Sequence, residues 1–411
     1  MPNLRLPAVV ARLLIVLSSA ALLAACGSQA SPAPSPASPV ASPSLAAPSA
    51  AASTTPSPQP SASDPPATAR PAVWSAPRRV PGLEGCLAAT ETIDASGTVH
   101  LAAQCEEDDI RLASSADGTH WTSRTFRPPS GRMLSGPEIA FDGNRLTVAY
   151  TRLAPAPQDE GCGEVIPVDV GVYVRTRSLP DGSWSAEQKL GETADSLMSL
   201  RSANGLRAVI VDKAGRVFYE TLIDGQLTRQ RITGAIGSAS LRIGDDGRPR
   251  VAFEAKDGIR LGTLDGGTFR SELIPGSSAG WDPTLVLGPG NVAYVLWNRA
   301  YNGGGCAEPG PDPKDGTYFA TDVGGSWASS RLSPRVGGTS LIVDPDTGEL
   351  NALVADFGSL TAFTRPAGGD WVEKTLMTGD SSSPVLRQDP TTGDLVAAFA
   401  GSEGIWTIRR S

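Results

Sequence analysis

Histidine and cysteine are scarce in this chain, and their scarcity excludes several kinds of site. The 411 residues include two histidines, His100 and His120, and five cysteines. Two histidines cannot build a multi-histidine zinc site, and five cysteines cannot supply paired zinc knuckles. A histidine base is available at two positions only, which weighs against an enzyme. We expect both histidines to be structural or exposed.

Basic residues are also fewer than acidic ones. The chain has 35 Lys and Arg against 43 Asp and Glu, which gives a formal net charge of −8. A negatively charged chain is not expected to bind nucleic acid as its main partner. Long apolar runs are missing after residue 26, while Gly (45) and Pro (35) are abundant. This composition argues against a helical bundle and favours a fold rich in turns.

Residues 1–25 are typical of an export signal. Arg5 and Arg12 flank the start of a short run of apolar and small residues, 13–25, which is too short to cross a bilayer. The run ends in Leu-Ala-Ala-Cys at Cys26, and this resembles the lipobox of bacterial lipoproteins. The resemblance implies lipidation of Cys26 and anchoring to the outer face of the bacterial cytoplasmic membrane, at the cell surface. An ordinary secretory signal is the alternative.

Residues 26–70 are dominated by Ser, Ala, Pro and Thr. Asp64 and Arg70 carry the only charged side chains of this segment. Such a sequence cannot bury enough apolar surface to fold, and its prolines keep it extended. We therefore expect a disordered tether that holds a domain of residues 71–411 away from the membrane.

The remaining residues contain a repeat. Seven aromatic or leucine anchors each open a short strand-like segment, and four of the six intervals between anchors are 42–47 residues long. A Gly-containing turn precedes each of the last six, and a hairpin turn with Asp or Gly lies further upstream. The anchors are Trp74, Trp121, Trp184, Leu227, Phe269, Trp327 and Trp371.

Four strands in each unit of about 44 residues predict an all-β fold, a seven-bladed β-propeller. The chain ends at residues 405–409 in a third strand, with no fourth strand after it. The segment 74–80 supplies the missing strand, so we predict that it closes the last blade. A six-bladed ring and a set of β-sandwiches are the alternatives.

The turn before the second anchor resembles the Asp-box, or BNR, repeat of sialidase-type propellers. The closest copy reads Ser-Ala-Asp-Gly-Thr-His-Trp at Ser115–Trp121, and a second copy ends at Phe269. The resemblance implies that Asp117 binds turn amides and that the aromatic side chain packs between sheets. It also implies that this turn lies on the face opposite an active site.

A sialidase-like glycoside hydrolase would need an arginine triad, a tyrosine paired with a glutamate, and an acidic aspartate. Arg152 and Arg299 stand at matching places in two repeats, with Tyr150, Tyr294 and Tyr301 nearby. The third arginine and the acid are not found, and sialidases usually have six blades. We therefore favour a binding protein over an enzyme.

Two insertions interrupt the repeat, at residues 152–170 and 298–316, and each contains Gly-Cys-x-Glu. Both fall between the second and third strands of a blade, where propellers bind ligands. Related loops on opposite sides of a ring suggest a paired lid, and plain decorated loops are the alternative. The candidate ligand face comprises Arg152, Glu160, Glu164, Asp212, Glu254, Arg299, Tyr301, Glu308 and Asp356.

Acidic residues gather on the same predicted face, including the run Glu106–Asp109. Carboxylates suit hard cations, so calcium or a basic ligand is one interpretation; a solvated acidic rim, with no cofactor, is the simpler one. We expect a monomeric module that binds or scaffolds a cell-surface glycan, peptide or protein. A glycoside hydrolase and a structural assembly factor are the alternatives.

Four cysteines remain after Cys26, and disulfides are expected in an exported protein. Cys86 and Cys105 flank the turn at residues 94–97 symmetrically, so they should face each other across a hairpin. Cys162 and Cys306 are then left to clasp the two insertions. A free catalytic cysteine is disfavoured because no histidine lies near Cys162 or Cys306 in the sequence.

Mass mapping of a non-reduced digest tests the second bridge. The expected result is one peptide pair joined through Cys162 and Cys306, beside the Cys86–Cys105 pair. Two free thiols at residues 162 and 306 would contradict the clasp.

Overall fold

The computed structural model describes most of the chain from residue 73 onward. The signal, Cys26 and the tether therefore lie outside the described residues. The described ranges are 73–105, 109–126, 133–154, 168–180, 182–190, 196–202, 205–212, 214–300 and 312–411.

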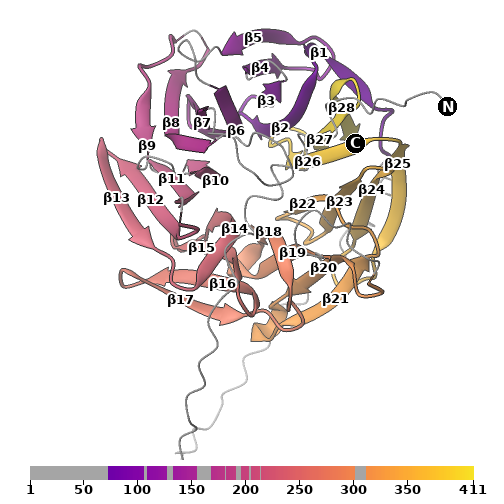
Figure 1. Ribbon diagram of the computed structural model, residues 1–411. Helices are drawn as coiled ribbons and strands as arrows, with labels where there is room; N and C mark the ends of the chain where they lie inside the picture. The colour runs from indigo at the N-terminus through magenta and orange to yellow at the C-terminus, as the bar shows by residue number, and fades with distance from the viewer. Residues whose placement is uncertain are drawn as a thin grey trace, which may run out of the picture. The chain divides into compact units, whose positions relative to one another are not determined.

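Seven four-stranded antiparallel sheets stand around a central channel (Figure 1). The first blade contains β2 (Cys86–Ile93), β3 (Val99–Cys105), β4 (Ile110–Ser115) and β5 (Thr122–Phe126). The second contains β6 (Met133–Asp142), β7 (Arg145–Ala154), β8 (Val168–Ser178) and β9 (Gln188–Leu190). The third contains β10 (Ser196–Ser202), β11 (Leu206–Val211), β12 (Val217–Ile223) and β13 (Gln226–Arg231). The fourth contains β14 (Ala235–Ile243), β15 (Pro249–Ala255), β16 (Gly258–Asp265) and β17 (Thr268–Leu273).

The fifth blade contains β18 (Gly280–Leu287), β19 (Ala293–Arg299), β20 (Gly316–Thr321) and β21 (Ala328–Ser333). The sixth contains β22 (Gly338–Val343), β23 (Leu350–Asp356), β24 (Ser359–Arg365) and β25 (Val372–Thr378). The seventh contains β26 (Ser381–Gln388), β27 (Leu395–Gly401), β28 (Gly404–Arg410) and the N-terminal β1 (Arg78–Glu84). The described residues include two 3₁₀ turns, η1 (Pro289–Asn291) and η2 (Val323–Gly325).

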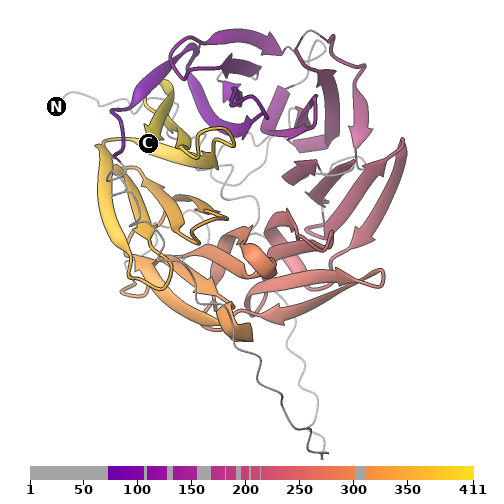
Figure 2. The same ribbon diagram turned by 180° about the vertical axis from the view of Figure 1, so that it is seen from behind.

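The N-terminal strand closes the ring, as predicted. β1 pairs antiparallel with β28, and Trp74 forms a further bridge to Arg410. Figure 2 shows the indigo strand β1 and the yellow strand β28 beside each other at this seam. Val80 and Leu83 of β1 are fully buried. The six-bladed and β-sandwich alternatives are therefore wrong, and the closing strand itself runs slightly later than residues 74–80.

The core lies between neighbouring blades rather than within any one of them. One cluster, for example, joins Ala252 and Ile259 of the fourth blade to Leu285 and Trp297 of the fifth. Second strands such as β27 are buried on both faces, so they are apolar throughout rather than alternating. The anchor aromatics pack on the edges of these clusters, whereas Leu227 is exposed.

The first strand of each blade lies nearest the centre of the ring and is called the inner strand (Figure 1). A side-chain hydrogen bond links each blade to the inner strand of the next. Three serines of inner strands accept a backbone N–H from the following inner strand. These are Ser199 from Leu241 (3.2 Å), Ser240 from Leu285 (3.1 Å) and Ser340 from Leu386 (3.0 Å). The other junctions are made by Thr90 to Pro137 (3.0 Å), Thr151 to Leu197 (3.1 Å), Thr284 to Thr339 (2.9 Å) and Arg387 to Glu91 (3.0 Å).

The predicted bridge between Cys86 and Cys105 is present and joins β2 to β3. Cys162 and Cys306 lie outside the described residues, so the clasp stays a prediction. Both insertions do connect second to third strands: β7 to β8, and β19 to β20. Within the part of the chain that is described, no helix has the length and apolarity needed to span a membrane.

The closing strand can be tested with Leu83→Ala. Leu83 is fully buried against the first and seventh blades, so its truncation should lower the free energy of unfolding by about 2–4 kcal/mol. Val73→Ala is the matched control because Val73 is 59% exposed, and it should change little. Urea unfolding of the full chain measures both, and equal midpoints would show that β1 contributes little to closure.

Candidate functional site

Four of the predicted ligand-face residues occupy equivalent places at one end of the ring. Arg299 and Asp356 each end the second strand of a blade, opposite the first residue of the third strand, and Arg152 lies two residues before the end of β7, opposite Gly171. Asp212 follows β11 in the same way, and Glu254 lies one residue before the end of β15. The remaining candidates, Glu160, Glu164, Tyr301 and Glu308, lie outside the described residues, as do Glu106, Glu107 and Asp108.

The two aspartates of this face are occupied by their own turns. Asp356 accepts the backbone N–H groups of Gly358 (2.8 Å) and Ser359 (2.6 Å). Asp212 accepts two backbone N–H groups and the Arg216 side chain (2.7 Å). Burial alone would raise the pKa of Asp212, but these hydrogen bonds hold it below its ordinary value. Both carboxylates therefore stabilise the turns that follow them in the chain.

Cation ligands are not grouped at this face in the part of the chain described. Among those residues, no three His, Cys, Asp or Glu side chains are placed to hold a metal ion. The calcium interpretation remains a prediction, since several of the acidic residues behind it are outside the described ranges.

Arg152 lies in a compact cluster with a carboxylate that the sequence analysis did not predict. Its guanidinium and the Tyr150 hydroxyl both bond to Glu187, just before β9. The guanidinium also lies 4.1 Å from the centre of the Tyr173 ring. Tyr150 is 3% exposed, and burial together with Glu187 raises the pKa of its phenol.

This cluster contains the tyrosine and glutamate of a sialidase nucleophile, but the tyrosine differs in its burial and protonation. A tyrosine nucleophile must lose its proton and reach the substrate, whereas Tyr150 is buried and held in the phenol form. The second predicted arginine, Arg299, pairs with Asp312 at 3.6 Å. Neither arginine is therefore an unpaired ligand for a substrate carboxylate.

Two partly buried carboxyl groups near the same end interact electrostatically. Burial raises the pKa of both Glu254, in β15, and Asp282, in β18, and the Asp282 charge raises that of Glu254 further. Gly237 leaves room for the carboxyl group of Glu254, because a Cβ at this position would lie 2.4 Å from one of its oxygens. Asp282 was not among the predicted residues.

A cavity of about 330 Å³ opens in the central channel at the opposite end of the ring. It lies beside the turns that join first to second strands, away from the predicted ligand face. Three arginines line it, Arg201, Arg242 and Arg387, from the third, fourth and seventh blades. Each stands shortly before the turn of its inner strand, which is the sequence signal that could have identified them.

The three arginines are held by backbone and not by carboxylates. In each, Nη1 donates to the carbonyl of the preceding residue: Leu200, Leu241 (2.8 Å) or Leu386 (2.9 Å). Among the described residues, no carboxylate oxygen lies within 4.0 Å of these guanidinium groups. Burial, followed by repulsion from Arg387, lowers the pKa of Arg201 to about 10, while Glu138 opposes the shift.

Glu91 is an unusual residue in the wall of this cavity. The equivalent position of the other six inner strands is leucine or isoleucine, whereas Glu91 puts a carboxyl group there, fully buried. Among the residues that the structure describes, neither carboxyl oxygen of Glu91 has a hydrogen-bond partner. Burial raises the pKa of Glu91 to about 8, although Arg387 acts in the other direction. The apolar equivalents are Ile139, Leu200, Leu241, Leu285, Leu341 and Leu386.

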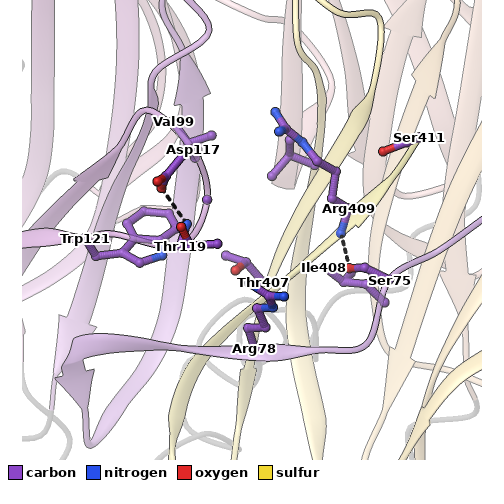
Figure 3. Close-up of a pocket in the computed structure, with 12 residues that line it drawn as sticks. Ser75, Arg78, Val99, Asp117, Thr119, Trp121, Thr407, Ile408, Arg409 and Ser411 are labelled. Atoms are coloured by element: carbon purple, nitrogen blue, oxygen red, sulfur yellow. Dashed lines mark hydrogen bonds between the residues drawn. The ribbon is translucent and has the colours of Figure 1, made fainter.

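A second cavity of about 220 Å³ lies at the seam between the first and seventh blades (Figure 3). Asp117 and Trp121 face it from one side, and Arg78 and Arg409 from the other. Asp117 accepts the backbone N–H of Thr119 at 2.7 Å, a turn contact of the kind that the Asp-box resemblance implied.

Both histidines have structural surroundings or solvent around them, as expected. His100 is buried between Asp94 (3.1 Å) and Ser114 (2.8 Å). His120 is exposed in the Asp117 turn.

Comparisons with known proteins identify the fold but no family. No protein-family model matches the chain, and no curated protein matches it. Hydrazine synthase from Kuenenia stuttgartiensis superimposes with a TM-score of 0.54 at 17% identity, over 80% of this chain and 96% of that chain. An ulvan lyase, a polysaccharide lyase, gives 0.52 at 14% identity, over 79% and 93%. Trypanosoma rangeli sialidase gives 0.43 at 11% identity, over 80% and 55%.

These similarities show the propeller fold alone. The neighbours include enzymes of unrelated kinds, and none is close enough in sequence to transfer an activity.

The buried Glu91 predicts a dependence of stability on pH. Folding raises the pKa of Glu91 from 4.5 to about 8. The free energy of unfolding is therefore highest below pH 4.5, where the carboxyl group is protonated in both states, and it falls as the pH rises toward 8. The free energy of unfolding of the wild type should fall by about 3–5 kcal/mol over that pH range. Glu91→Gln should not show this fall, because its side chain does not ionise. Glu403→Gln, at an exposed site, is the control.

Urea unfolding at pH 5, 7 and 8.5 measures the effect. The difference in unfolding free energy between wild type and Glu91→Gln should grow with pH in favour of the variant. Parallel pH profiles would contradict it.

Proposed function

We propose that this β-propeller is an exported, membrane-anchored lipoprotein module that binds a ligand in its central channel. The observation that supports it is the cavity of about 330 Å³, which combines cationic and apolar lining. Ligand sites in proteins commonly have this size and contain a few polar groups among apolar ones. The export signal, the lipid on Cys26 and the tether are the sequence expectations that place the module outside the cytoplasmic membrane.

A cell-surface glycan is the ligand class to test first, followed by peptides and partner proteins. The fold is shared with a polysaccharide lyase, and ring-shaped domains present loops and a channel mouth to carbohydrate as readily as to protein.

A sialidase-like glycoside hydrolase is the second candidate, and the contact between Tyr150 and Glu187 favours it. Three features weigh against it. The phenol is buried with a raised pKa, Arg152 is paired with Glu187, and Arg299 is paired with Asp312. The arginines that share a cavity are other residues, at the other end of the channel.

A glycan array combined with a fluorogenic-glycoside screen on the full chain separates the two candidates. We expect binding without turnover, and at least tenfold weaker binding in Arg242→Ala, because Arg242 lines the cavity. Arg270→Ala is the matched control, since that side chain is 80% exposed, and it should bind as the wild type does. Turnover of any glycoside that disappears in Arg152→Ala would establish the hydrolase instead.

A further inference from the structure

The inner strands present one residue each to the channel at a common level. In every blade this residue pairs with the second residue, or its equivalent, of the buried second strand. The seven positions are Thr92, Ala140, Arg201, Arg242, Val286, Ile342 and Arg387. All seven line the same cavity. We call this set the channel ring.

The channel ring is asymmetric in size and charge. Thr92 and Ala140 are small, and they lie between the blades that carry Arg387 and Arg201. Arg387 reaches the first blade, where its Nε donates to the carbonyl of Glu91, and its positive charge lowers the pKa of Arg201. Val286 and Ile342 form an apolar arc on the other side of the cavity.

The next level of the channel does not neutralise these charges. Five of its residues are Ser or Thr, and their hydroxyls make the links between blades described above. Glu138 is the acidic residue of this level, and burial raises its pKa. Glu91, beside the ring, also has a raised pKa. Glu138 interacts with Arg201 and Arg387, and Glu91 with Arg387, so the two carboxyl groups that could neutralise these arginines both resist ionisation.

The guanidinium groups retain free donors. With acceptors in the described ranges, Arg201 and Arg242 bond through Nη1 alone, and Arg387 bonds through Nη1 and Nε. In the described part of the chain, Nη2 of each therefore has no protein acceptor. A guanidinium fork fits two oxygens of a phosphate or sulfate group, and such charge-assisted bonds are strongest where water is partly excluded.

We propose that the channel ring binds a phosphate or sulfate group, with Arg201, Arg242 and Arg387 as its ligands. The apolar arc then contacts the body of the molecule that carries the group. This inference rests on the proposed function in placing ligand binding in the channel cavity, and it adds the chemical class of the ligand. It assigns a function to residues at the end of the ring opposite the predicted ligand face.

Isothermal titration of the full chain with inorganic phosphate, and separately with inorganic sulfate, tests the proposal. We expect saturable binding that weakens at least tenfold in Arg242→Gln and in Arg201→Gln, since each loses a charge-assisted bond. Arg270→Gln should bind as the wild type does. The bound anion should also raise the melting temperature of the wild type and not that of the two variants, which separates a binding role from a folding role.

Two further arms identify the source of the group. A sugar phosphate and a sulfated sugar are titrated beside the inorganic ions, and tighter binding of either one identifies the class of carrier. No heat and no thermal shift with all four compounds would overturn the proposal, as would binding that is unchanged in both variants. If array glycans still bind the channel in that case, the proposed function stands and only the oxyanion site fails.

Discussion

The side-chain hydrogen bond that joins each blade to the inner strand of the next is the constraint on which the ring depends. A four-stranded blade cannot cover both of its faces, so it is stable only between two neighbours. The apolar clusters supply most of the contact, while a side chain such as Ser199, Ser240 or Ser340 fixes the height of one inner strand against the next. The level of the channel wall that contains these serines therefore has a structural role. The adjacent level, the channel ring, makes none of the hydroxyl links between blades, so its side chains are available to contact a ligand.

The architecture could be predicted from the sequence because its signals are local. Asp-Gly and Asn-Gly turns and the aromatic anchors each report on a few neighbouring residues, and their spacing gives the number of blades. The closing strand followed from an incomplete last unit, and the Cys86–Cys105 bridge from symmetry about one turn. The alternating pattern was less informative for second strands, since these are buried on both faces.

The site could not be predicted in the same way, because distant blades build it. In the sequence, each of the three cavity arginines is a charged residue before a turn, like many others. Closure of the ring brings Arg201, Arg242 and Arg387 to one cavity. Glu187 was missed since its pairing with Arg152 crosses from the second strand of a blade to the segment before the outer strand. Matching positions correctly aligned Arg152 with Arg299, but sequence cannot show that each already has a partner.

The position of the Cys86–Cys105 bridge has a mechanical consequence. Tension applied through the N-terminal segment reaches the ring at the bridge between Trp74 and Arg410, and it then loads the contacts of β1 with β28. Detachment of β1 would pass the load through Gly85 to β2, and there a covalent bond ties the strand to β3. The disulfide therefore limits unravelling to a single strand, which can pair again when the tension is released.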